Sequence, residues 1–90
     1  MLTNIFELEL AYANSHMEII MTLVQAIEGQ DYIIKDIVSD DEELKAFLFS
    51  LGCYSGETIT VVSRMRGGCV VSIKDSRYNI DNALADAISV

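Results

Sequence analysis

The feature that most constrains the fold is an abrupt change of hydrophobic period at Gly52. Before this glycine, apolar residues recur at the three- and four-residue spacing of one helix face: Leu44, Phe47, Leu48 and Leu51. After it, apolar and polar residues alternate, as in half-buried strands. A chain that passes from one amphipathic helix into a series of short strands is expected to form a mainly β domain with one inserted helix.

The inserted helix is predicted to span about residues 39–51. Ser39 is the expected N-cap, and Glu42, three residues later, would complete a capping box. The acidic run from Asp40 to Glu43 falls in the first turn, where negative charge complements the helix dipole. This placement explains the run without a bound cation. Gly52 suits the left-handed position that follows the last helical turn.

Short strands are predicted on both sides of the helix. Residues 32–38 form one expected strand after a turn at 28–30, and residues 57–64 and 69–74 form a hairpin through Gly67 and Gly68. A turn at 75–76, a strand at 77–80, a short helical turn capped by Asp81 and a last strand at 88–90 complete the pattern. About five strands and one helix are expected to close into a small, partly open β-barrel, because closure removes exposed edges.

The chain has 90 residues, which suits one domain. Residues 1–20 are expected to be an extension, either a helix that packs on a neighbour or residues added by cloning or an upstream start site. Residues 21–90 are expected to form the compact domain. The extension carries three Glu and no Lys or Arg, so the compact part has eleven acidic and six basic residues. A net charge of −8 disfavours binding to nucleic acid or to anionic membranes.

The sequence lacks the residue patterns that identify several classes of enzyme. The sequence has neither a phosphate-binding loop of the GxxxxGK[ST] type nor a GxGxxG turn before a helix. His16 is the only histidine and lies in the extension, so a Ser/His or Cys/His nucleophile pair is not expected. No apolar run is long enough to span a membrane. An enzyme is the least favoured class.

The two cysteines, Cys53 and Cys69, are sixteen positions apart and belong to no CxxC pair. They are expected to be reduced, partly buried thiols of a cytosolic protein. The alternative is that both thiols, together with nearby carboxylates, bind a transition metal ion, either Fe²⁺ or Zn²⁺.

The segment from Leu48 to Val62 resembles the helix-to-strand signature of the FeoA family, roughly L-x-x-L-G-[apolar]-x-P-G-x-x-[apolar]-x-[apolar]. The hairpin through Gly67 and Gly68 and the ending from Ala85 to Val90 are also similar to that family. The resemblance covers residues 22–90. Two positions depart from the pattern: Ser55 stands where Pro is usual, and Cys53 occupies an apolar position.

The resemblance implies an SH3-like β-barrel, a fold also found at the C-terminus of DtxR-type iron-dependent repressors. It implies a non-enzymatic, cytoplasmic accessory protein of bacterial ferrous iron uptake that interacts with a FeoB-type membrane transporter. The resemblance implies no catalytic residues. The expected contact surface combines the helix end with the following hairpin tip: Phe49, Leu51, Tyr54, Arg64, Met65 and Arg66. A homodimer that buries Phe49 is a further option.

Two other functions are weighed against this one. A metal-sensing or regulatory SH3-like module would bind its ion through Cys53 and Cys69. A peptide adaptor of the eukaryotic SH3 kind would need an aromatic-lined groove. The chain has no Trp, and its four Tyr are scattered, so such a groove is hard to build here.

Overall fold

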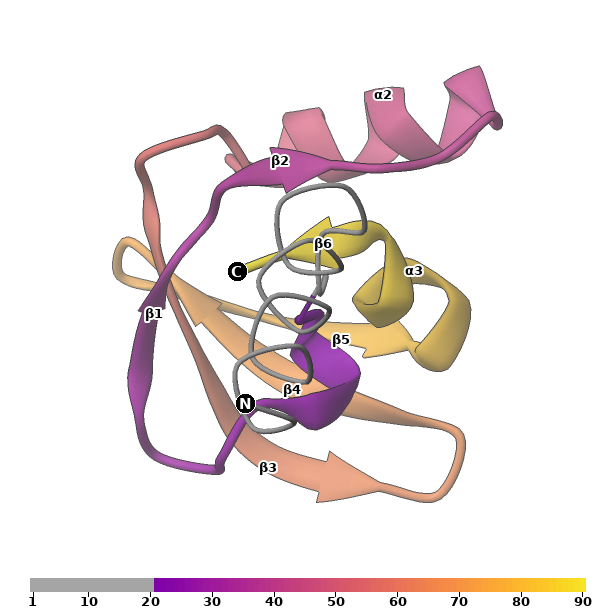
Figure 1. The fold of residues 1–90 in the computed structure, drawn as a ribbon. Helices are drawn as coiled ribbons and strands as arrows, with labels where there is room; N and C mark the ends of the chain where they lie inside the picture. Colours follow the sequence, from indigo (N-terminus) through magenta and orange to yellow (C-terminus); the bar gives the residue numbers. More distant parts are fainter. Residues whose placement is uncertain (1–20) are drawn as a thin grey trace, which may run out of the picture.

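The computed structural model describes residues 21–90, and the predicted extension lies outside them. Figure 1 shows a curved sheet with the inserted helix at one side. In chain order, the elements are η1 (Leu23–Gln25), β1 (Asp31–Ile33), β2 (Asp36–Ile37), α2 (Glu42–Leu51), β3 (Thr58–Met65), β4 (Gly68–Ile73), β5 (Ser76–Asp81), α3 (Asn82–Ala87) and β6 (Ile88–Ser89).

All strand pairs are antiparallel and form two sheets. The larger sheet has the order β1-β3-β4-β5, and the smaller one pairs β2 with β6. An isolated bridge between Thr22 and Ser89 ties the start of the described chain to β6. The prediction of a mainly β fold with one inserted helix and a short C-terminal helical turn is confirmed.

The core lies between the concave face of the larger sheet and the elements that cover it. Alternate residues of β4 point inward, namely Cys69, Val71 and Ile73, as the period of two predicts. They meet η1, the α3 turn and Leu48 of α2 in one apolar cluster. Its buried apolar members are Leu23, Ala26, Ile34, Ile37, Leu48, Cys53, Ile59, Val61, Cys69, Val71, Ile73, Ile80, Ala85, Ala87, Ile88 and Val90.

The single strand predicted for residues 32–38 is wrong, because the chain changes sheets at Ile34. The main chain of this fully buried residue exchanges hydrogen bonds with the loop before β3: its N–H donates to Glu57 O at 2.8 Å, and its carbonyl accepts from Gly56 N at 2.8 Å. The N–H of Lys35 then donates to Ser89 O at 2.7 Å. One β-rich segment therefore gives β1 to the larger sheet and β2 to the smaller one.

The predicted N-cap of the inserted helix is also wrong by two residues. Asp41 is the N-cap, and its Oδ1 accepts hydrogen bonds from the N–H groups of Glu43 at 3.0 Å and Leu44 at 3.2 Å. Ser39 instead accepts from the N–H of Asp41 at 3.0 Å and shapes the entry turn. The predicted helix end is confirmed, since Gly52 has a φ of 99° in the left-handed region.

Of the two turns that flank β4, the first lies where the sequence predicted it and the second does not. The hairpin between β3 and β4 lies at Arg66 and Gly67, as predicted. The next turn lies at Lys74 and Asp75, one residue earlier than predicted, because Ser76 already pairs with Ile73. Lys74 accordingly has a positive φ of 56°. Asp81 caps α3 as expected, since its Oδ1 accepts from Leu84 N at 2.8 Å.

Candidate functional site

An exposed aromatic pair, Phe49 and Tyr54, lies where α2 leads into β3. The two rings stack with centroids 5.9 Å apart and an angle of 6° between their planes. Phe49 is 39% exposed and Tyr54 is 51% exposed. Between them, Gly52 turns the chain, and the N–H of Cys53 donates to Leu48 O at 3.1 Å. The capped end of the helix therefore holds two large aromatic side chains at the surface.

Leu51 does not share the face of Phe49. The two residues are two positions apart, which rotates them by about 200° around the helix. Leu51 is half-buried and packs against the core, as does Leu44, while Phe49 faces solvent. Phe47 was predicted on the buried stripe but is 47% exposed, so the apolar face of α2 is anchored mainly by Leu48.

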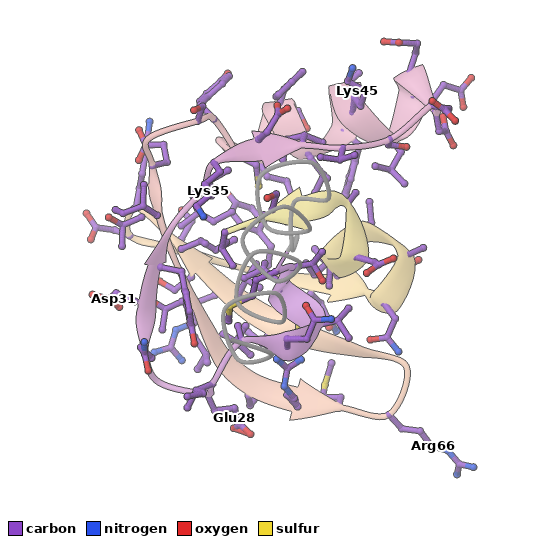
Figure 2. The ribbon with its side chains drawn as sticks, viewed as in Figure 1. Glu28, Asp31, Lys35, Lys45 and Arg66 are labelled. Carbon is purple, nitrogen blue, oxygen red and sulfur yellow. The ribbon has the colours of Figure 1, made fainter. Side chains whose placement is uncertain are left out.

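The hairpin tip holds the other three predicted contact residues, and they play different parts. Arg64 turns back on the fold: its guanidinium donates to the carbonyl oxygens of Leu23, at 2.7 Å, and of Ala26. Leu23 is the first residue of η1 and Ala26 is its C-cap, so the side chain of Arg64 fixes this short helix against β3. Met65 is 45% exposed, and Arg66 extends into solvent from the turn (Figure 2).

The aromatic pair and the hairpin tip are two separate regions. Tyr54 precedes the first residue of β3, Thr58, and the tip follows the last, Met65. Seven steps along a strand cover about 23 Å. Figure 1 shows α2 and this hairpin at opposite sides of the molecule. One small partner domain that touches both regions would have to span the length of β3.

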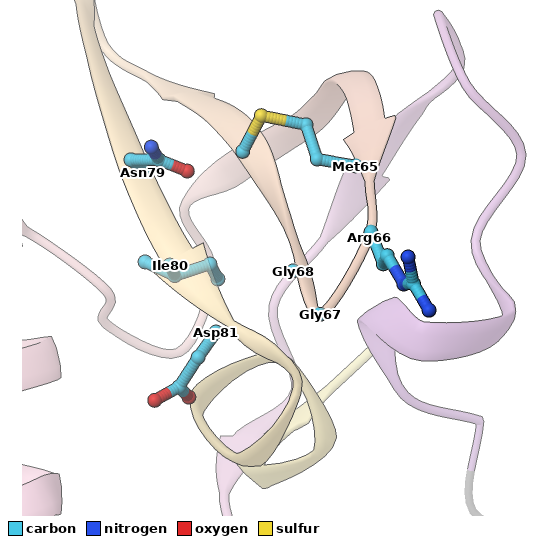
Figure 3. Close-up of a pocket in the computed structure, with 7 residues that line it drawn as sticks. All are labelled: Met65, Arg66, Gly67, Gly68, Asn79, Ile80 and Asp81. Carbon is cyan, nitrogen blue, oxygen red and sulfur yellow. The ribbon is translucent and has the colours of Figure 1, made fainter.

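A shallow cavity of about 340 Å³ lies at the hairpin tip, which the sequence did not single out as a pocket. In Figure 3 the side chain of Met65 extends across β4 toward Asn79, and Arg66 points away. Gly68 forms the floor, because a Cβ there would overlap the carbonyl oxygen of Ile80. The signal available in the sequence was the pair Gly67 and Gly68, and between two strands such a pair indicates a hairpin far more readily than a binding site. The lining residues are Met65, Arg66, Gly67, Gly68, Asn79, Ile80 and Asp81.

Both cysteines are free thiols and fully buried in the core. Burial raises the pKa of Cys53 to about 11. Burial also raises the pKa of Cys69, although the nearby Arg64 charge opposes this shift. Because the thiolate is the form that binds metals, these pKa shifts disfavour ligation at neutral pH.

The described residues do not offer a donor set for a tightly bound transition metal ion. Within residues 21–90, no three His, Cys, Asp or Glu side chains come together in a group that could hold one. In the same part of the chain, every buried side-chain nitrogen or oxygen has a hydrogen-bond partner, so no orphaned polar atom marks a ligand position. The involvement of Cys53 and Cys69 in metal binding stays a hypothesis.

No helix within residues 21–90 is long and apolar enough to cross a membrane. The curated proteins contain no significant match to this sequence. Solved structures do share the fold. The chain is similar to a FeoA described as an iron uptake regulatory protein, with a TM-score of 0.71 and 25% identity over 80% of this chain and 96% of that one.

Two further structures share the fold at lower identity. The zinc complex of Stenotrophomonas maltophilia FeoA, described as a prokaryotic SH3 domain protein, gives a TM-score of 0.68 and 16% identity over 76% of this chain and 86% of that chain. A manganese-dependent transcriptional repressor gives a TM-score of 0.73 and 20% identity. That match covers 87% of this chain but only 45% of the repressor, so the present chain resembles one part of it.

The domain profile that matches this sequence is that of the FeoA domain, over residues 21–90. This range begins one residue before the resemblance noted in the sequence and includes every strand and helix described above. The SH3-like fold implied by that resemblance is confirmed by the solved structures. The chain belongs to the FeoA family.

Proposed function

We propose that this protein is a non-enzymatic accessory protein of bacterial ferrous iron uptake, which acts in the cytoplasm by binding the cytosolic region of a FeoB-type transporter. The observation that carries the proposal is the exposed aromatic pair on a FeoA-family fold. Stacked aromatic side chains exposed on a small protein are typical of binding surfaces, because they offer large apolar area at a small cost in side-chain entropy.

The surroundings of the aromatic pair suit a protein partner. Tyr54 adds a phenolic hydroxyl that can form a hydrogen bond at the rim of a contact. The pair is held by the left-handed turn at Gly52, so its geometry exists before binding. A surface that is ordered in advance loses less entropy when a partner binds.

Charge at the other end of the same helix suggests the nature of the partner surface. Asp40, Asp41, Glu42 and Glu43 are all exposed at the N-terminal end of α2. A helix of ten residues is about 15 Å long, so these acidic groups and the aromatic pair fit within one ordinary interface. The acidic end would speed association with a basic surface, and the aromatic pair would provide affinity.

The hairpin tip is the second part of the proposed contact surface. Met65 and Arg66 are exposed there and are free to touch a partner. Arg64 contributes indirectly, because its guanidinium already holds η1 in place. A transporter domain that contacts both regions would have to span the length of β3, about 23 Å.

The direct test is binding of the full chain to the purified cytosolic region of the transporter from the same cell. The Phe49→Ser variant should weaken binding at least tenfold, since an aromatic hot spot contributes about 2 kcal/mol or more. Ile27→Ser is the matched control, because Ile27 is 63% exposed and lies beside η1, on another surface. Equal binding by both variants would exclude the aromatic pair from the interface.

The functional test is ferrous uptake in cells. Deletion of the gene should lower Fe²⁺ uptake, and the Phe49→Ser variant should fail to restore it while the Ile27→Ser variant succeeds. Normal uptake in the deletion strain, together with no detectable association with the transporter region, would refute the proposed function.

A further inference from the structure

Strand β5 is the last strand of the larger sheet, and within residues 21–90 no other strand pairs with its outer edge. Among the described elements, β4 lies along one edge of β5, and α3 follows β5 directly in the chain. Open edges of this kind invite pairing with another chain, and proteins usually block them with Pro, Lys or bulges. The edge of β5 contains no Pro and no Lys.

The register of the hairpin shows which main-chain groups face this edge. The N–H of Asn82 donates to Gly67 O at 3.0 Å, which continues the β4–β5 ladder by one step. Hydrogen-bonded and non-hydrogen-bonded pairs alternate along an antiparallel ladder. The N–H and carbonyl groups of Arg77 and Asn79 therefore point away from β4, toward the open edge. The N–H of Asp81 points the same way, while its carbonyl begins the hydrogen bonding of α3. No other backbone hydrogen bond within residues 21–90 involves the main chain of Arg77 or Asn79.

The geometry points to a second copy of this chain as the partner of β5. Residues at equal distances on the two sides of Asn79 have complementary side chains: Arg77 and Asp81 carry opposite charges, and Tyr78 and Ile80 are both apolar in character. Two antiparallel copies related by a two-fold axis at Asn79 place each Arg77 opposite the other Asp81. They also place each Tyr78 opposite the other Ile80. Opposite charges and aromatic–β-branched pairs are the favourable cross-strand combinations.

The backbone supports the same register. A two-fold axis at Asn79 makes the two Asn79 residues a hydrogen-bonded pair, and both already present their free N–H and carbonyl groups there. Arg77, Asn79 and Asp81 are exposed, while Ile80 is buried and Tyr78 is half-buried. Pairing would join two four-stranded sheets into one sheet of eight strands, with an isologous interface.

Three other registers of the same strand place like charges together. A two-fold axis at Arg77 brings two guanidinium groups opposite each other, and an axis at Asp81 does the same for two carboxylates. Parallel in-register pairing creates both repulsions at once. These charges disfavour those three registers. Within the strand, an axis at Tyr78 or Ile80 brings no like charges together but also forms no Arg77–Asp81 pair, so the Asn79-centred dimer has the most favourable charge pairing.

The interface involves one short strand from each copy, so association in the micromolar to millimolar range is expected. Sedimentation velocity of the full chain over that range should show a monomer–dimer equilibrium. In parallel, hydrogen exchange of the Arg77 and Asn79 amides should slow as concentration rises. A protein that stays monomeric throughout, with exchange at these amides independent of concentration, would overturn the inference.

Two variants test the edge itself. Asn79→Pro removes the outward N–H but not a bond to β4, so the dimer should be lost while the sheet remains. Asn79→Ala keeps the N–H and should still form the dimer. If Asn79→Pro is folded and associates as tightly as the unchanged protein, β5 is not the interface.

Charge provides a test that does not depend on a proline. Arg77→Asp places carboxylates opposite each other at two symmetric positions and should weaken the dimer about tenfold. Lys35→Asp makes the same charge change between β1 and β2, away from β5, and should leave the dimer constant unchanged. Equal weakening by the two variants would mean that net charge, and not the β5 register, controls association.

Discussion

Strand β4 and helix α2 belong to the same small domain but are packed in different ways. Four of the six β4 residues are buried, namely Gly68, Cys69, Val71 and Ile73. Helix α2 has ten residues and buries only Leu48. Two of its aromatic side chains, Phe47 and Phe49, are exposed instead.

This difference separates the part of the molecule that maintains the fold from the part that is available for contacts. The hydrophobic effect follows the apolar area removed from water, so β4 and its neighbours provide most of the stability. Helix α2 is held against the core by the buried Leu48 and by the half-buried Leu44 and Leu51, which leaves its outer surface free. A substitution in β4 should therefore affect folding, and one on the outside of α2 should affect binding.

The largest effect is expected at Gly68, where β4 begins. A Cβ at this position would overlap the carbonyl oxygen of Ile80, and a backbone atom cannot rotate away. We expect Gly68→Val to destabilise the fold by more than about 3 kcal/mol. Urea denaturation followed by circular dichroism measures this loss.

Gly67→Ala is the matched control for Gly68→Val. Gly67 has open space around it but a φ of +87°, so alanine there should cost only about 1–2 kcal/mol of backbone strain. If Gly68→Val were as stable as Gly67→Ala, the close approach of β4 and β5 would not limit the fold.

The next largest effect is expected at Leu48, the single buried anchor of α2. Leu48→Ala should destabilise the protein by about 3 kcal/mol, because it leaves a cavity that the helix can only partly fill. Phe47→Ala, one residue away and 47% exposed, should cost less than about 1 kcal/mol.

Hydrogen exchange would sharpen this comparison. In Leu48→Ala the amides of α2 should lose protection more than those of β4, because the helix has no other buried side chain. Equal loss of protection in both elements would show that α2 and the sheet open as one unit.

Cys53 lies in the core shortly after α2, and its burial predicts a pH dependence. The folded thiol has a pKa raised to about 11 from an ordinary value of 9.0. The unfolded chain therefore loses this proton first, so the contribution to stability is full below pH 9 and is lost as the pH rises to about 11. The loss should approach about 2–3 kcal/mol.

The measurement is the free energy of unfolding in urea at several pH values for the unchanged protein and for Cys53→Ala. The variant should be less stable at neutral pH, since it leaves a cavity, but should lose less stability in alkali. Parallel pH profiles would mean that Cys53 ionises equally easily in the folded and unfolded chains.

The sequence predicted the elements whose local signals agree with their tertiary positions. The hairpin at Gly67 and Gly68, the inward side of β4 and the left-handed end of α2 are confirmed because turn chemistry and period pointed to the same answer. The segment 32–38 was different. Its β-branched residues favour a strand throughout, and only the pairing with two separate sheets breaks it at Ile34.

The candidate site was predictable only in part, for a related reason. Phe49 falls off the helical stripe, which is compatible with either a second contact or an exposed position, and it is 39% exposed. Periodicity placed Phe47 on the buried side, but one helix against a small sheet cannot cover the whole stripe. The contact between Arg64 and the carbonyls of η1 joins positions about forty residues apart, and nothing local to Arg64 indicates it.

The smallest effect concerns the start of α2, where two residues could have served as the cap. The carboxylate of Asp41 accepts from two helix N–H groups, so Asp41→Ala should cost about 1 kcal/mol. Ser39 accepts only from the N–H of Asp41, outside the helix, and Ser39→Ala should cost less than half as much. Asp41→Asn should be nearly neutral, because Asn caps as well as Asp. Thermal unfolding of the three variants ranks their stabilities. A larger loss of stability in Ser39→Ala than in Asp41→Ala would mean that Ser39, and not Asp41, caps the helix.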